Sequence, residues 1–105
     1  MGNCVRKSAP ILLALAAGCA IAEPPLEELG QSRAAVVRAI VAGAERSAPG
    51  ELALAREKIR LGERWIGAPD YTSARWLVEQ ARVDAELAEV KAAAAQARHA
   101  GMGRR

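Results

Sequence analysis

Small apolar residues recur at alternating spacings of four and three along the C-terminal part of this chain. The members of this row are Ala74, Val78, Ala81, Ala85, Ala88, Ala92 and Ala95. These spacings place the side chains on one face of an α-helix, and small side chains let a neighbouring backbone approach closely. A strict seven-residue repeat also favours a left-handed, nearly parallel crossing. The row therefore predicts one long helix, from about Tyr71 to His99, with other helices packed along it.

The residues before this helix predict two shorter helices. Apolar residues at helical spacing run from Leu26 to about Ala44. Pro49 suits the first turn of a second helix, which continues to about Ile66, and Asp70 is placed to cap the long helix. The second helix carries two apolar rows, which predict contact with two neighbours: Leu52, Ala55, Ile59, Gly62 and Ile66 in one, and Leu54, Leu61 and Trp65 in the other. We expect an all-α fold, either a three-helix antiparallel bundle or a hairpin-like arrangement similar to a tetratricopeptide hairpin, with a long C-terminal helix after a cleaved signal peptide.

The N-terminal residues have the pattern of an export signal. Arg6 and Lys7 precede an apolar run of about a dozen residues, which is shorter than the roughly 20 needed to span a bilayer. The string Leu15-Ala16-Ala17-Gly18-Cys19 resembles the bacterial lipoprotein signal, which implies a lipid on the Cys19 thiol; an ordinary signal peptide with a spare thiol is the alternative. The expected parts are a signal peptide over 1–18, a lipidated N-terminus and linker over 19–25, a helical domain over 26–99 and a flexible tail over 100–105.

Charge and cysteine content exclude several classes of partner. Cleavage after residue 18 removes Arg6 and Lys7, so the positive residues fall from 15 to 13 against 12 acidic ones, and the net charge falls from +3 to +1. Without a strongly positive surface, we expect no nucleic-acid binding. Cys4 leaves with the signal peptide and Cys19 carries the lipid, so we expect neither a disulfide nor a metal thiolate, and no cofactor.

The sequence does not predict an enzyme. His99 is the only histidine, and its place in the last turn of the long helix suits a partner of the helix dipole. The serines and threonines have no placed base that could activate a hydroxyl nucleophile. The carboxylates belong to exposed helix faces and helix starts, where nothing would shift their pKa values toward catalysis.

Two groups of residues are candidates for binding. Trp65 and Trp76 flank the turn that contains Tyr71, and we expect these rings to close the end of a thin core. The alternative is an aromatic clamp for a glycan or a peptide. The second group, on the second helix, could meet an anionic partner, and its members are Arg56, Arg60 and Arg64.

The long helix carries two further rows. One is apolar and is expected beside the alanine row: Trp76, Val83, Leu87, Val90 and Ala94. The other, with charges that alternate in sign, is expected on the opposite face: Arg75, Glu79, Arg82 and Glu86. The charged row is typical of a solvated face held by internal ion pairs, with a recognition strip as the alternative.

Several short motifs in residues 26 to 98 carry a resemblance to a known family. They are Ala48-Pro49-Gly50-Glu51-Leu52, Ala55-Arg56-Glu57-Lys58, Asp70-Tyr71, Ala74-Arg75, Leu77, Glu79-Gln80-Ala81, Asp84-Ala85 and Leu87-Ala88. The chain resembles the alanine-rich bacterial lipoproteins built on a helical domain of unknown function, whose longer members carry an OmpA-like peptidoglycan-binding domain. This resemblance implies no catalytic residues.

These observations lead to two functional hypotheses. The preferred one is a lipid-anchored lipoprotein of the cell envelope, facing the periplasm from the outer membrane, that acts as a non-catalytic interaction or scaffolding module. Its partner would be a second copy, joined through an overhanging alanine row around residues 92–98, or an OmpA-like envelope protein. The alternative is a module that binds peptidoglycan or another anionic polymer through the Trp pair or the arginines.

Overall fold

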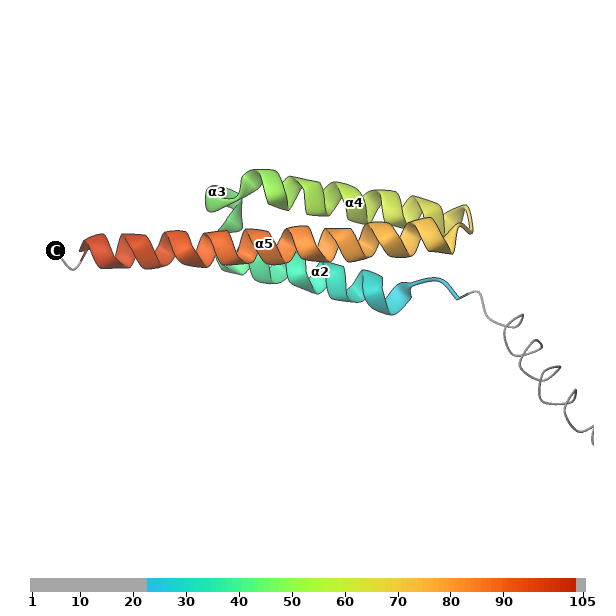
Figure 1. Ribbon diagram of the computed structural model, residues 1–105, viewed down its shortest axis with the longest axis horizontal. Helices are drawn as coiled ribbons and strands as arrows, with labels where there is room; N and C mark the ends of the chain where they lie inside the picture. Colours follow the sequence, from blue (N-terminus) through green and yellow to red (C-terminus); the bar gives the residue numbers. More distant parts are fainter. Residues whose placement is uncertain (1–22, 104–105) are drawn as a thin grey trace, which may run out of the picture.

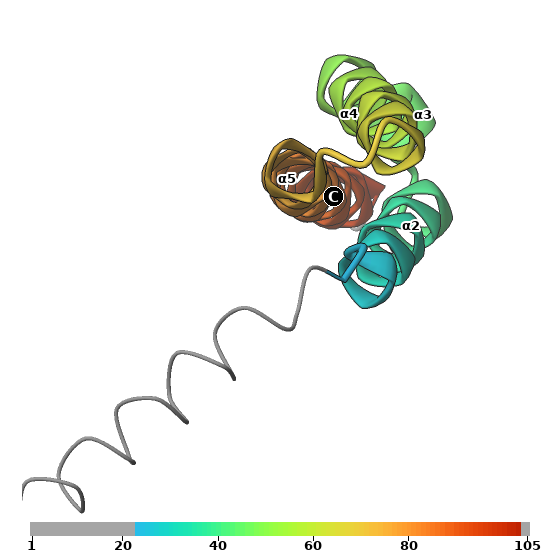
Figure 2. The ribbon, with the colours of Figure 1, turned by 90° about the vertical axis from the view of Figure 1, so that its right-hand side faces the viewer.

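The computed structural model describes residues 23–103, which form a bundle of helices (Figure 1). The elements are α2 (Leu26–Val41), the short α3 (Ala44–Ser47), α4 (Pro49–Gly67) and α5 (Tyr71–Gly103), and residues 23–103 contain no strand. α4 runs antiparallel to both α2 and α5 (Figure 1). The end-on view places the three long helices at the corners of a triangle, with α5 against both of the others (Figure 2). The all-α fold with a long C-terminal helix is therefore confirmed.

The alanine row of α5 forms the axis of the core. Six of its seven members are buried, and Ala95 is half-buried. The row meets larger side chains from the neighbouring helices, including Leu29 and Val36 of α2 and Leu52 and Ile59 of α4. Because most α5 positions in the core are alanine, the helices can approach closely. The core is consequently narrow, and Leu52 and Val78 are its largest fully buried side chains.

α4 and α5 approach each other closely at Gly62. A Cβ atom at this position would lie 2.7 Å from Cγ1 of Val78, which is fully buried. A buried valine in a helix has one strongly preferred rotamer, so its methyl group cannot readily turn away. Gly62 is therefore required by the packing of the two helices.

The first helix ends earlier than the sequence predicted. A continuous helix to Ala44 was expected, but α2 ends at Val41 and Gly43 adopts a left-handed conformation with φ of +99°. Glycine tolerates this conformation without a steric penalty, and it commonly follows a helix end. The chain then turns into α3, which lies against α5 near the end of α2.

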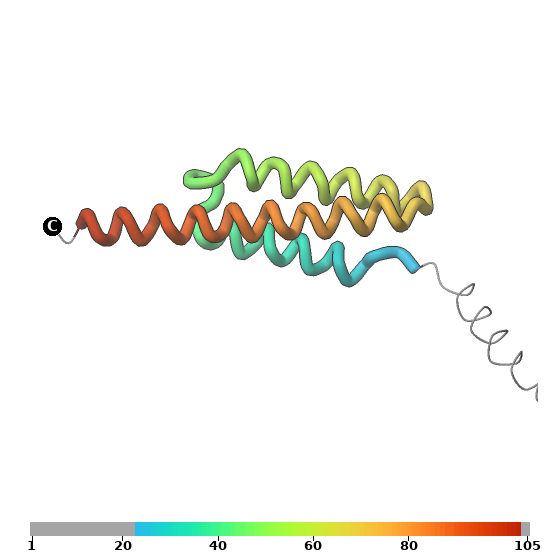
Figure 3. Tube along the Cα trace, in the orientation of Figure 1, coloured from blue at the N-terminus to red at the C-terminus, as the bar shows by residue number. Residues whose placement is uncertain are grey.

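The C-terminal helix continues further than expected, and its overhang begins later. The tail predicted to be flexible over residues 100–105 is helical as far as Gly103. The prediction that the alanine row overhangs the bundle from Ala92 onward is wrong. Ala92 is fully buried, and the Gln96 Nε2 group donates a hydrogen bond to the carbonyl of Ala42 at 2.5 Å. The short α3, which the sequence did not predict, extends the cover over α5. Only the turns beyond Gln96 pass the rest of the bundle (Figure 3).

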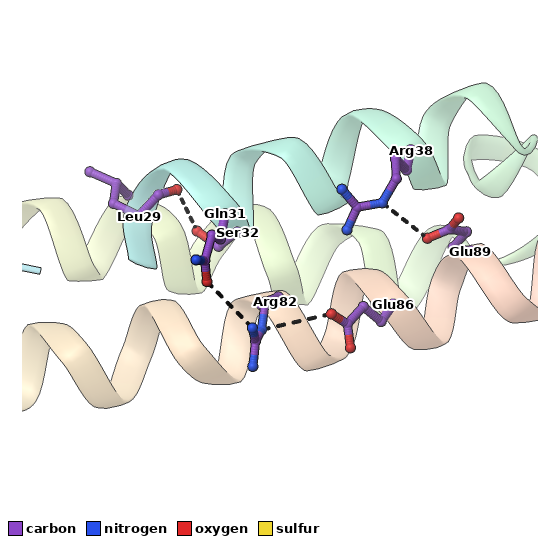
Figure 4. A network of polar contacts seen from close by, with 7 residues as sticks. All are labelled: Leu29, Gln31, Ser32, Arg38, Arg82, Glu86 and Glu89. Carbon is purple, nitrogen blue, oxygen red and sulfur yellow. Dashed lines mark hydrogen bonds and ion pairs between the residues drawn. The ribbon is translucent and has the colours of Figure 1, made fainter. Parts of the chain in front are cut away.

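Polar contacts join α2 to α5 along the outside of the core. The pairs are Arg75 with Glu28 at 2.8 Å, Arg82 with Gln31 at 3.4 Å and Arg38 with Glu89 at 3.6 Å. Figure 4 shows the last two, together with Glu86 beside Arg82. Three members of the row of alternating charges on α5, namely Arg75, Arg82 and Glu86, are thus engaged in ion pairs or hydrogen bonds, partly within α5 and partly with α2.

Asp70 caps α5 as the sequence predicted. The Ser73 backbone N–H donates to Oδ1 of Asp70 at 3.1 Å, and the Ser73 hydroxyl donates to Oδ2 at 2.8 Å. These hydrogen bonds favour the ionised carboxylate and lower the pKa of Asp70. The cap fixes where the long helix begins, and so the register in which α5 meets α4.

A pair of glycine substitutions tests the packing at Gly62. Gly62→Ala should destabilise the bundle by about 1 to 3 kcal/mol, because overpacking outweighs the gain in helix propensity. Gly30→Ala is the matched control, since nothing lies within 4 Å of a Cβ there, and it should stabilise the protein by up to about 1 kcal/mol. Chemical denaturation measures both changes.

The double variant Gly62→Ala with Val78→Ala separates a clash from a general effect on α4. Removing the Val78 methyl groups makes space for the new Cβ, so the two substitutions should cost less together than the sum of their separate costs. Strict additivity would contradict the proposed contact.

Candidate functional site

Four large apolar side chains of α5 are exposed and lie outside the core. They are Trp76, Val83, Leu87 and Val90, and their exposed fractions lie between 46% and 65%. We call these four residues the outer seam. They were expected beside the alanine row, but their helical spacing and exposure place them on the side of α5 opposite that row. Figure 2 shows that α2 and α4 both lie to one side of α5.

The second apolar row of α4 lies next to this surface. It was expected to contact a second neighbour, yet Leu54 and Trp65 are exposed and Leu61 is half-buried. The residues of the first row of α4 already pack in the core. The second row therefore adds apolar surface beside α5 instead of filling an interior.

The two tryptophans come together in an open groove at the hairpin end of α4 and α5. The groove has a volume of about 500 Å³ and is lined by Leu61, Trp65, Thr72, Ser73, Trp76 and Leu77. We call it the aromatic groove. The expectation that these rings close the core is wrong, because Trp65 is 43% exposed and Trp76 is 61% exposed. The alanine-lined core has no room for indole rings, so the rings lie outside it. Tyr71 is half-buried and does not line the groove.

The arginine row of α4 is largely neutralised by acidic neighbours. Arg56 pairs with Glu45 of α3 at 3.3 Å, and Arg60 pairs with Glu57. Arg64 instead borders a smaller groove of about 250 Å³, which it shares with Leu61, Trp65 and Ala68. The structure therefore places one of the three arginines in a groove with Trp65 and leaves the other two in ion pairs.

Two ion pairs between α4 and α5 lie along one edge of the outer seam. The Lys58 Nζ atom lies 2.6 Å from Oδ2 of Asp84, and both side chains are partly buried. Lys91 pairs with Glu51, and its ammonium group lowers the pKa of that carboxyl. The seam itself contains no ionisable group, so charge borders the apolar strip without interrupting it.

In the described part of the chain, the remaining candidate side chains are not gathered into a common site. His99 lies at the edge of an open cavity of about 640 Å³ with Gln96, Arg46 and Glu45. Within residues 23–103, no three metal-ligating side chains lie together, and no helix is long and apolar enough to cross a membrane. Cys19 and the predicted signal peptide lie outside the described residues.

The residues of the outer seam were identified from the sequence as an apolar row, but not as an exposed one. The available signal was that α5 carries two apolar rows in different directions, while residues 23–103 contain two other long helices, α2 and α4. Since both of those helices pack on the alanine row, the larger side chains were left without a neighbour.

Truncating a seam residue should leave the fold intact. Trp76→Ala should change the free energy of unfolding by less than about 1 kcal/mol, as substitutions of exposed residues do. Leu52→Ala is the core comparison and should cost about 2 to 5 kcal/mol, because Leu52 is 1% exposed. Thermal unfolding followed by circular dichroism measures both. Equal losses in the two variants would mean that Trp76 is part of the core.

Comparison with known proteins agrees with the helical pattern. Residues 27–101 match the family described as a domain of unknown function, DUF4398, so the match spans α2 to nearly the end of α5. No curated protein and no solved structure matches the chain. The chain belongs to the DUF4398 family.

Proposed function

We propose that this protein is a lipid-anchored component of the bacterial cell envelope that acts as a non-catalytic helical interaction module. The observation that carries the proposal is the outer seam. It presents four large apolar side chains on one face of α5, although the opposite face of the same helix is already buried.

A helix on the surface of a monomeric protein normally has one apolar face, which is directed at the core. α5 has two. The four seam residues lie at helical spacings over four turns, and the exposed Leu54 and Trp65 of α4 extend the apolar surface. Extended exposed apolar patches are typical of interaction sites. A straight strip with this spacing fits a helix from a partner better than a small ligand.

The anchoring part of the proposal rests on the sequence before the bundle. Six residues lie between Cys19 and Leu26, so seven residue-to-residue steps limit the distance between the lipid and the start of α2 to about 25 Å. The start of α2 and the aromatic groove lie at the same end of the bundle (Figure 1). The apolar surface would therefore be held close to the membrane and to other proteins at that membrane.

A second candidate function is binding of an envelope polymer such as peptidoglycan. The aromatic groove supports it, because two exposed indole rings can stack on sugar rings, and Arg64 lines a neighbouring groove with Trp65. The groove is mainly apolar in its lining, which favours a protein partner. Titration with muropeptides, followed by Trp fluorescence, distinguishes the two: a saturable shift that Trp76→Ala abolishes would favour the polymer.

Lipidation is tested on the mature N-terminus. Mass spectrometry should find an acylated Cys19 as the first residue, because the preceding string fits the lipoprotein signal. Cys19→Ala should release the protein from membranes, since the apolar run is too short to serve as a stable span. A mature chain that starts at another residue would contradict the anchor.

The interaction surface is tested by photo-cross-linking in cells of the source organism. A photoreactive residue at Leu87 should form one discrete protein adduct, and adding Val90→Lys should suppress it. Val41 is the matched control, because it is an apolar residue of α2 with 80% exposure that lies outside the seam. Adducts of equal strength from both positions, or none from Leu87, would contradict an interaction role for the seam.

A further inference from the structure

We infer that the outer seam binds a second copy of this chain, with the two α5 helices packed antiparallel. This inference rests on the proposed function, since it names the partner of the same surface. It is supported by the way in which side-chain size and side-chain charge are distributed along α5.

The seam belongs to a seven-residue repeat that continues beyond the four large residues. At alternating spacings of four and three, the outward positions of α5 are Trp76, Gln80, Val83, Leu87, Val90, Ala94, Ala97 and Gly101. None of these positions carries a charge. This is the spacing with which one helix packs against another in a coiled coil. From Trp76 to Gly101 the repeat spans about 38 Å.

The side chains of this repeat decrease in size toward the C-terminus. Trp76, Val83, Leu87 and Val90 occupy the first half, and only alanine and glycine follow. If a second copy runs antiparallel, with the centre between Leu87 and Val90, Trp76 and Val83 each face a small residue, and Leu87 meets Val90 at the centre. The facing layers are then Trp76 with Gly101, Gln80 with Ala97, Val83 with Ala94, and Leu87 with Val90 of the second copy.

A parallel pair lacks this complementarity. It would place Trp76 against Trp76 of the second copy at one end, and only alanine and glycine against each other at the other end. Well-packed helices need a constant separation, so such a wedge-shaped interface would be poorly filled. The size gradient therefore selects the antiparallel arrangement.

The charges that border the seam agree with the same register. In an antiparallel pair, Asp84 lies opposite Lys91 of the second copy, and two-fold symmetry repeats this contact. Glu79 and Glu86, on the other border, lie opposite Ala100 and Ala93. No like charges meet. In a parallel pair, Glu79 would lie opposite Asp84 of the second copy, which is repulsive.

The bundle leaves this side of α5 open. α2 and α4 pack on other sides of α5, and no other segment of residues 23–103 covers the side turned away from both (Figure 2). The turns of α5 beyond Gln96 have no cover within the described residues (Figure 3). In the antiparallel pair, these turns lie against the hairpin end of the second copy, next to Trp76. The overhang then completes the interface.

Sedimentation of the full mature chain in density-matched detergent tests the pairing. The wild-type chain should form dimers, and Leu87→Lys should weaken self-association at least about tenfold, because each dimer loses two central apolar contacts. Val41→Lys is the matched control and should dimerise like the wild type. Circular dichroism should show equal helicity in all three, since both positions are exposed and lysine is a good helix former.

Orientation is tested by charge rescue. Val83→Glu should weaken the dimer, and adding Ala94→Lys to the same chain should restore it, because residue 83 faces residue 94 of the second copy only in the antiparallel register. The control is Val83→Glu combined with Val90→Lys, in which dimer formation should not be restored.

Two outcomes would overturn the inference: a monomeric wild-type chain at high micromolar concentration, or a dimer that Ala94→Lys does not rescue. A monomeric chain that still forms a discrete adduct with another protein through Leu87 would overturn only the choice of partner. The proposed function itself falls if the Leu87 probe forms no discrete adduct.

Discussion

The close approach of α5 to its two neighbours is the constraint on which the rest of the structure depends. A row of alanines permits it, and Gly62 of α4 leaves out a Cβ that would collide with Val78 of α5. Because the helices are so close, the interior holds few large side chains, with Leu52 and Val78 the largest that are fully buried. The hydrophobic contribution per residue is then modest, and the high helix propensity of alanine supports the fold. Ion pairs such as Arg75 with Glu28 and Lys58 with Asp84 align the helices along the edges of this core.

The same constraint explains where the large apolar side chains are found. An interior of this width has no room for the rings of Trp65 and Trp76, so the indoles lie at the surface. Val83, Leu87 and Val90 are exposed for a different reason. Their spacing and exposure place them on the side of α5 opposite the alanine row. Both neighbouring helices pack on the alanine row, at the other side. Most of the larger apolar surface of α5 is thus displaced outward, to a face that a partner can reach.

The sequence predicted the helices well because their signals are local. Pro49 and Asp70 mark two helix starts, and the spacing of the alanines defines one buried face. The break at Gly43 was missed because a single glycine within a periodic pattern does not reveal its φ angle. The tryptophans were misplaced for a more general reason. Periodicity shows which residues share a face, but only the arrangement of all helices shows which face has a neighbour. The role of Arg56 likewise depended on Glu45 of α3, a helix that the sequence pattern did not indicate.

An antiparallel pair would impose a definite geometry on a membrane-anchored protein. The start of α2 lies level with Arg75 on α5, because Glu28 pairs with that arginine. If the two α5 helices cross midway between Leu87 and Val90, the two α2 starts are separated by about 40 Å along the helix axis. Each linker from Cys19 reaches only about 25 Å. Both lipids can enter the same bilayer only if the long axis of the dimer lies roughly parallel to the membrane. Lipid anchoring and antiparallel pairing together therefore favour a flat dimer, in which two anchors hold one rigid, elongated body against the membrane surface.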